Sequence, residues 1–539
     1  MRKKIKSKKF KSLVKEYFDA VIKRFPEYGS FLGLQKYDGK WSKEDIKTYL
    51  ENTKFYKRYL NKFIKINLKR LSEKDKLDKE IIIQNLKLII FYLEELHLWE
   101  SDPDIAEGIG VTLFLLLNRQ DISNDEKIKK INKYLKGAPP LFEQIKTRIT
   151  KPYRLWVEIA IDSCEGLLSF LENLKLIKIR KSFKKEFLQN IKLSLKAVED
   201  YRYFLKKDIL LISINKHIIG ENKFRRLIKL RELGLNIKEM LEIGERALSV
   251  NKKELKEIAR EINPRLTVKE VEKKIEKKHS DNFKEIIKQY RRITAKARNF
   301  ILTHNLIEIP KDEKIIIKET PSFLIHTTPF AAYFSPPKFV KKKVGIYIIT
   351  PAKQKRLLER HNYTSIFNTS VHEAYPGHHL QFVLGFKNPS LVRILSGATE
   401  MIEGWAHYCE EYMRDVGFNN TAETRFVQTQ DEIWRAARII IDINLHFGKM
   451  SFNEAVRFLM KKVGMEKENA IAEVKRYTKS PGYQLSYLIG KHLIKRLKRD
   501  IQEKMGEKYS DRFFHEVILN AGSVPIKYLK EEFNLKINK

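Results

Sequence analysis

The sequence predicts a mainly α protein, a large helical fold with one small β-element near residues 314–350. Residues 10–310 carry apolar side chains at three- and four-residue spacing, with few breaks. The same spacing returns after residue 350 and continues to the end of the chain. Only 314–318 and 344–350 are short β-branched runs flanked by prolines, which is typical of strands. We therefore expect two parts, a helical N-terminal half over 1–310 and a second half over 311–539.

Composition indicates a globular protein. The chain has 539 residues, of which 42% are hydrophobic, so it can bury a large core. Its two cysteines, Cys164 and Cys409, lie far apart, which argues against a disulfide framework or a cysteine zinc site and fits a reducing compartment. The basic N-terminus is followed by amphipathic sequence, and the longest apolar run, 111–117, is too short for a membrane span. We expect a cytoplasmic protein without a membrane segment.

The formal net charge of +39 has two interpretations. One is binding to nucleic acid or another anionic surface. The other is a lysine-rich solvated surface, which we favour because the basic runs at 180–185 and 341–343 are scattered and lack the glycine and aromatic residues of RNA-binding motifs. We expect no specific nucleic acid partner. Residues 371–415 instead hold six acidic and three basic residues, which suits a cation site.

One motif dominates the sequence: Ser-Val-His-Glu-Ala-Tyr-Pro-Gly-His-His-Leu-Gln at 370–381. An ordinary zinc helix carries His-Glu-x-x-His, whose histidines lie one turn apart on one face. Here the spacing is longer. On a regular helix His378 would point about 120° away from His372, and His379 would regain the face about 10 Å along the axis, too far for joint ligation.

Pro376 changes this geometry because its ring clashes with the carbonyl four residues earlier, that of His372. We predict a bulged turn that absorbs two residues and brings His378 to the ligand position. His372 and His378 are then the zinc ligands, and His379 contacts a ligand or the substrate. The opposite assignment of His378 and His379 stays open.

Glu403 is the expected third ligand. Glu400, Glu403, His407 and Glu410 share one helical face about 30 residues after His372. A solvated, salt-bridged surface is the other interpretation of such a face. A carboxylate there would complete a His₂Glu zinc site with an open fourth position, and Glu400 or His407 could orient a ligand.

These residue types point to metal-dependent hydrolysis. Zinc lowers the pKa of a bound water to about 7 and polarises a scissile carbonyl. Glu373, next to the first ligand, is suited to take the water proton and pass it to the leaving amine. The part of the chain from 311 to 539 is therefore the expected catalytic half.

The last third of the chain offers further candidates. Arg435, Arg438, Asp442 and His446 follow one another at three- and four-residue spacing, which predicts either an internal ion pair or an arginine for a substrate carboxylate. After Pro481-Gly482, Tyr483 and Tyr487 are four residues apart. Tyrosines at this spacing are either core residues or donors to an oxyanion.

Together these motifs resemble the prokaryotic family named domain of unknown function 885. The resemblance covers 372–381, 403–408, the 435–446 segment and 481–490, with weaker signatures at 31–38 and 521–525. It implies a helical fold similar to gluzincin peptidases of the oligopeptidase and carboxypeptidase Taq type, with a substrate channel between helical halves. It also implies an edge strand at 344–350 that binds substrate backbone, and oxyanion tyrosines at 483 and 487. The lengthened His-Glu spacing departs from those peptidases.

The sequence hypothesis is thus a zinc-dependent peptidase acting on short peptides. The expected catalytic residues are Glu373, Tyr487 and His407, and the expected Zn²⁺ ligands are His372, His378 and Glu403. The expected substrate-binding residues are His379, Arg435, Arg476 and Tyr483. The alternatives are a zinc amidohydrolase of other substrates and a non-catalytic metal-binding or basic nucleic-acid-binding protein.

Overall fold

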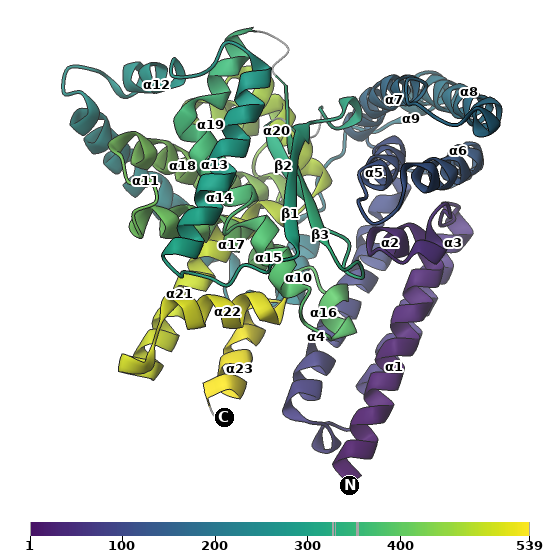
Figure 1. Ribbon diagram of the computed structural model, residues 1–539, viewed down its shortest axis with the longest axis horizontal. Coiled ribbons are helices and arrows are strands. Elements are labelled where there is room, and N and C mark those ends of the chain that lie inside the picture. The colour runs from purple at the N-terminus through teal and green to yellow at the C-terminus, as the bar shows by residue number, and fades with distance from the viewer. Residues whose placement is uncertain (1, 326–327, 329, 352–354, 538–539) are drawn as a thin grey trace. The chain divides into compact units, whose positions relative to one another are not determined.

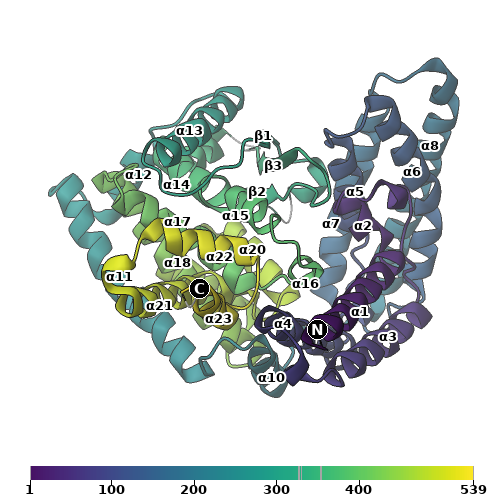
Figure 2. The same ribbon diagram turned by 60° about the horizontal axis from the view of Figure 1, so that its bottom comes forward.

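The computed structural model describes residues 2–325, 328, 330–351 and 355–537, and it is built mainly of α-helices with one three-stranded sheet (Figures 1 and 2). The predicted mainly α fold with a small β-element is confirmed. None of the described helices is both long enough and apolar enough to span a bilayer. The chain forms two compact units, one of Met1–His217, Thr320–Pro329 and Pro336–Val344, the other of Ile218–Glu319, Phe330–Ser335 and Gly345–Lys539.

The first unit is helical, and its α-helices are α1 (Arg2–Arg24), α2 (Pro26–Phe31), α3 (Ile46–Ile64), α4 (Glu73–Phe91), α5 (Ala106–Leu117), α6 (Asn124–Lys146), α7 (Arg154–Leu174), α8 (Lys181–Phe204) and α9 (Leu210–Ile212). Helix α8 packs against both α6 and α7 (Figure 1). Phe142 of α6 meets Tyr201 of α8 with ring centroids 5.2 Å apart. The Ser194 hydroxyl donates to the Leu135 carbonyl at 3.0 Å. Aromatic packing and buried hydrogen bonds therefore hold these helices in register.

The second unit holds the other helices: α10 (Glu221–Arg231), α11 (Ile237–Ile262), α12 (Val268–Glu276), α13 (Phe283–Thr303), α14 (Tyr363–Glu373), α15 (His378–Gly385), α16 (Leu391–Leu395), α17 (Thr399–Asp415), α18 (Ala422–His446), α19 (Phe452–Val463), α20 (Lys467–Lys479), α21 (Leu488–Met505), α22 (Asp511–Ala521) and α23 (Ile526–Ile537). Residues 218–310, which the sequence assigned to the N-terminal half, pack in this unit. Helix α18 packs along α11, and α17 along α21.

The sheet has the order β1–β3–β2, with β1 at Glu313–Glu319, β2 at Ala331–Phe334 and β3 at Lys343–Ile349. Strands β1 and β3 match the two predicted runs, whereas β2 was not predicted. β2 pairs antiparallel with β3, and Tyr333 lies opposite Tyr347. Because β3 is the central strand, the expectation that 344–350 forms a free edge is wrong. The edges of the described sheet are β1 and β2.

An apolar cluster joins the sheet to the helices that carry the site. Ile286 and Tyr290 of α13 are buried together with Tyr347 of β3 and Ile366 of α14. The Tyr290 and Tyr347 rings meet edge to face, with centroids 5.7 Å apart. This packing fixes α14, whose last turn carries His372 and Glu373, against a rigid β-layer.

Candidate metal centre

The central motif is folded as two helices rather than one bulged helix. Helix α14 ends at Glu373, α15 begins at His378, and the peptide bond between Tyr375 and Pro376 is cis. The predicted bulged turn is therefore wrong in form, because the helix stops completely. The cause is the one that Pro376 suggested: it cannot donate to the helical ladder, and its ring would meet the carbonyl of His372.

Gly377 allows the turn to fold back onto the end of α14. A Cβ atom at this position would lie 1.8 Å from the His372 carbonyl oxygen and 2.4 Å from that of Val371, so a side chain is excluded. The Gly377 amide donates to the Val371 carbonyl at 3.0 Å. Trp405 of α17 donates its indole N–H to the Pro376 carbonyl at 2.9 Å. The tight turn brings the His378 ring to a centroid distance of 4.9 Å from that of His372.

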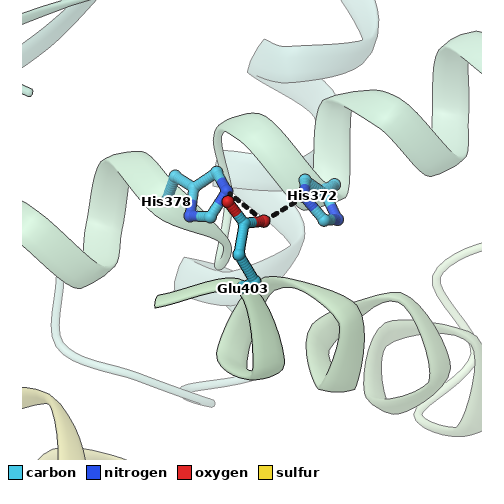
Figure 3. Close-up of side chains that lie close together, drawn as sticks. All are labelled: His372, His378 and Glu403. Carbon is cyan, nitrogen blue, oxygen red and sulfur yellow. Dashed lines mark ion pairs between the residues drawn. The ribbon is translucent and has the colours of Figure 1, made fainter. Parts of the chain in front are cut away.

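His372, His378 and Glu403 converge on one point (Figure 3). Glu403 Oε2 lies 3.7 Å from His372 Nε2 and 3.5 Å from His378 Nε2. Four ligands held tetrahedrally about 2.1 Å from zinc are separated from one another by about 3.4 Å. The observed spacings are close to that edge length, and all three side chains are buried. Within the part of the chain that the structure describes, this is the one group of three side chains arranged to hold a metal ion.

A carboxylate behind the site orients the first histidine. His372 Nδ1 donates to Glu410 Oε1 at 2.7 Å, which directs Nε2 toward Glu403. Asn368 donates to the other Glu410 oxygen at 2.8 Å. The expectation that Glu400 orients a ligand is wrong, because Glu400 pairs with Arg231 at 3.0 Å. Burial opposes protonation of His372, but Glu403 and Glu410 raise its pKa to about 10.

Glu403 is oriented from the opposite side by the turn before α21. The Tyr483 hydroxyl donates to Glu403 Oε1 at 2.5 Å, which leaves Oε2 for the imidazoles. Asp442 holds that turn by accepting from the Gly482 and Gln484 amides at 3.2 and 3.1 Å. One oxygen of the Glu403 carboxylate thus accepts from Tyr483, and the other faces the two histidines.

Two glycines bring α17 and the start of α21 into backbone contact. A Cβ atom on Gly404 would lie 2.5 Å from the Gly490 backbone. A Cβ atom on Gly490 would lie 2.2 Å from the Glu400 carbonyl oxygen. Only glycine fits on each side of this contact, which lies one residue from Glu403 in α17 and three residues after Tyr487.

Glu373 is buried beside the two histidines. Burial raises its pKa above the ordinary value, while His372 and His378 act in the opposite direction. A buried carboxyl group with a raised pKa beside two histidines is suited to take up and release a proton.

His379 lies in a separate group of contacts, away from the three converging side chains. Tyr333 donates to His379 Nδ1 at 2.8 Å, and His379 Nε2 donates to Glu313 Oε2 at 2.6 Å. Tyr375 and Arg298 also donate to Glu313, at 2.5 and 2.8 Å. Burial opposes ionisation of Glu313, but these hydrogen bonds, first that from His379, lower its pKa to about 2. Both ring nitrogens of His379 are occupied, so the structure places it as a fully buried support of the turn.

The comparisons with known proteins can now be set beside this geometry. A family model described as "Bacterial protein of unknown function (DUF885)" matches residues 26–533. The chain belongs to this family. No curated protein matches it. Two solved structures share the fold of this DUF885 member at low sequence identity.

One is a candidate lipoprotein of unknown function from Shewanella oneidensis, with a TM-score of 0.76 and 19% identity over 97% of this chain and 99% of that one. The other is a candidate lipoprotein from Colwellia psychrerythraea, with a TM-score of 0.85 and 18% identity over 99% of both chains. At these identities the likeness shows the fold alone.

The arginines of this DUF885 member that were expected to bind substrate form ion pairs with buried or half-buried carboxylates. Arg435 pairs with Asp431 at 2.9 Å and with Glu410 at 3.4 Å. Arg438 and Arg476 share the one carboxylate of Glu473, at 3.0 and 2.9 Å. Two guanidinium groups against one carboxylate leave one positive charge in excess in this group.

Tyr487 and His407 occupy different surroundings. The Arg438 guanidinium lies 4.4 Å from the centre of the Tyr487 ring, and the Tyr483 ring lies 5.9 Å from it. His407 Nδ1 lies 3.6 Å from Glu410 Oε1, beyond hydrogen-bond distance. His407 therefore neighbours the carboxylate that orients His372.

The sequence analysis missed Glu313 and Tyr333, which come from strands β1 and β2. Neither carries a motif signal, because their link to His379 spans more than 45 residues of chain. The sequence placed Glu410 on the acidic helical face, but spacing alone could not predict its hydrogen bond with His372.

Proposed function

We propose that this protein is a zinc-dependent hydrolase, and specifically a peptidase that cleaves short peptides. The observation that carries the proposal is the convergence of His372 Nε2, His378 Nε2 and Glu403 Oε2 at separations that match a tetrahedral zinc site. A site of two histidines and one carboxylate leaves a position for water, as hydrolytic zinc sites do.

Glu373 is the proposed general base. It follows a proposed ligand directly in the sequence, and its burial keeps its pKa raised. Zinc would supply Lewis acidity toward the scissile carbonyl. Glu373 would take a proton from the attacking water and return it to the leaving amine nitrogen.

The substrate side is proposed around Tyr487 and Arg476. Tyr483 donates to Glu403, so its hydroxyl serves the ligand, and Tyr487 is the better candidate for an oxyanion donor. Arg435 is held by Asp431 and Glu410, whereas Arg476 shares its carboxylate and its side chain is 28% exposed. Arg476 therefore suits a substrate carboxylate better than Arg435.

Strand β2 is the proposed contact for the substrate backbone. It is an edge of the described sheet, and helix α14 packs against it. An edge strand offers unpaired amides and carbonyls to an extended peptide. Gluzincin peptidases, which the sequence motifs resemble, support this assignment by analogy of fold.

The test combines metal analysis with a digest of a defined peptide mixture. We expect one zinc per chain and cleavage that Glu373→Gln reduces by about 10² or more while zinc stays bound. Glu285→Gln, on the exposed face of α13, is the matched control and should keep wild-type cleavage. Absence of zinc would overturn the metal assignment. Equal cleavage by wild type and Glu373→Gln would overturn the role of Glu373. Bound zinc without any cleavage by wild type would leave a non-catalytic metal-binding protein.

A further inference from the structure

A polar cavity lies beside Glu410, the carboxylate that accepts from His372, and none of His372, His378 and Glu403 lines it. Its volume is about 230 Å³, and helices α11, α17, α18 and α21 form its walls. An apolar cavity of about 150 Å³ already accommodates a benzene molecule, so this one has room for a small organic molecule.

The lining carries an excess of negative charge. Four glutamates face the cavity, Glu254, Glu410, Glu411 and Glu432, against one lysine and one arginine. With His407 neutral, two negative charges remain on the lining itself. Beyond the lining, Arg435 and Lys495 pair with Glu410 and Glu411, and Asp431 and Asp415 pair with Arg435 and Arg414, so these outer charges cancel. This excess stands out in a chain whose formal net charge is +39. The lining therefore favours a cation.

His407 gives the second and independent indication of a ligand. Its side chain is 99% buried and lines the cavity, yet neither ring nitrogen has a hydrogen-bond partner among the described residues. Burial, and then the charge of Lys491, lower its pKa, so the ring is neutral and offers one acceptor nitrogen. A buried polar ring without partners calls for a group in the cavity that hydrogen-bonds to it.

The two cationic side chains of the lining already have acceptors. The Lys491 ammonium lies 2.7 Å from both Glu411 and Glu432 and is therefore shared between two carboxylates. Arg414 donates to Asp415 at 2.8 Å and to Gln428 at 3.2 Å. The lining thus offers more acceptors than donors, and a group rich in N–H donors would complement it.

We propose that this cavity binds a small organic cation with a guanidinium or primary ammonium head. The lining fits such a head in charge, in its shortage of donors and in size. A divalent metal ion fits less well, because no three of these side chains within the described chain converge as a ligand set, and Lys491 already occupies the space between Glu411 and Glu432.

Calorimetric titration of the full-length protein tests the proposal with guanidinium chloride as the probe, at constant ionic strength. We expect one saturable site with a Kd on the order of 1 mM, which four heavy atoms can supply. Urea has the shape of guanidinium without its charge, and tetramethylammonium has the charge without N–H donors. Neither should saturate over the same range. Because the titration needs no turnover, it stands whether or not the protein cleaves peptides.

Two variants locate the site. Thr429→Leu fills the cavity, and Glu432→Gln removes one of its charges; each should raise the guanidinium Kd by about tenfold or more. Glu257→Gln, an exposed position on α11 outside the cavity lining, is the matched control and should bind as wild type. Circular dichroism identifies a variant that fails to fold, in which case the other variant decides.

Three results would overturn the proposal. The first is the absence of saturable binding in wild type, which would mean that water alone fills the cavity. The second is equal binding of guanidinium and urea, or unchanged binding in the folded variants. The third is a second equivalent of zinc that Glu432→Gln removes, which would make this a metal site.

Discussion

His372 Nδ1 lies 2.7 Å from Glu410 Oε1, and this single hydrogen bond determines which ring nitrogen faces Glu403. Carboxylates that hold a ligating histidine in this way contribute about 10- to 100-fold to metal affinity. We therefore expect Glu410→Gln to weaken zinc binding by about that factor, measured by competition with a chromogenic chelator. Glu411→Gln, at the next position of the same helix, should bind zinc as wild type. Equal affinities for the two variants would contradict the role of Glu410.

His378 and His379 are neighbours with opposite expected effects. His378→Ala removes one of the three converging atoms and should lower zinc affinity by about a hundredfold or more. His379→Ala should retain zinc but lower the free energy of unfolding by about 1–3 kcal/mol, because buried Glu313 loses a donor. Zinc content after dialysis and chemical denaturation measure the two effects. Loss of zinc in His379→Ala alone would reverse the ligand assignment.

Gly377 should tolerate no side chain. Gly377→Ala places a Cβ atom against the His372 carbonyl, so we expect a loss of about 2–4 kcal/mol in unfolding free energy together with weaker zinc binding. Gly385→Ala is the control, because its nearest backbone atoms would lie 3.4 and 3.5 Å away, an ordinary contact. Urea denaturation of the two variants gives the comparison. Equal stability would show that the turn can relax without cost.

His515 makes stability depend on pH outside the metal centre. Its burial, and then the charge of Lys498, lower its pKa from 6.5 to about 3. The unfolded chain takes up a proton below about pH 6.5 and the folded chain does not until about pH 3. Stability from this group is therefore complete above pH 6.5 and falls as the pH drops toward 3, by at most about 1.4 kcal/mol per pH unit.

His515→Gln separates this contribution from that of other groups. Glutamine keeps an acceptor for the Tyr408 hydroxyl, which lies 2.8 Å from His515 Nε2, but it does not titrate. We expect the unfolding free energy of the variant to fall less steeply than that of wild type between pH 6.5 and 4. Parallel curves from denaturant titrations would show that His515 does not carry the effect.

Local patterns in the sequence were enough for the helical class and for strands β1 and β3, because apolar spacing and β-branched runs are local signals. Strand β2 was missed because Ala331–Phe334 has only four residues, and it becomes a strand only by pairing with β3. The same pairing places β3 in the centre of the sheet, so the edge strand expected at 344–350 is not an edge, and β2 is one instead. Strand order depends on contacts that no local pattern encodes.

The candidate site also has features that the sequence predicted and features that it could not. Pro376 and Gly377 indicated from the sequence that regular helical spacing fails here. The complete break could not be predicted, because it depends on how Gly377 packs against the His372 carbonyl. Glu313 could not be found from the motif, since β1 reaches His379 only after folding. Residues that act through neighbours distant in the chain need the tertiary structure.

The contact between Gly404 and Gly490 has a consequence for how the protein can change. Since each backbone occupies the space of the other residue's side chain, neither glycine can be replaced unless the two helices separate. Separation would carry Glu403 away from Tyr483, whose hydroxyl fixes its direction. Natural variation at 404 and 490 should therefore be nearly absent. Random mutagenesis followed by a screen for folded protein should recover no substitution of Gly404 or Gly490.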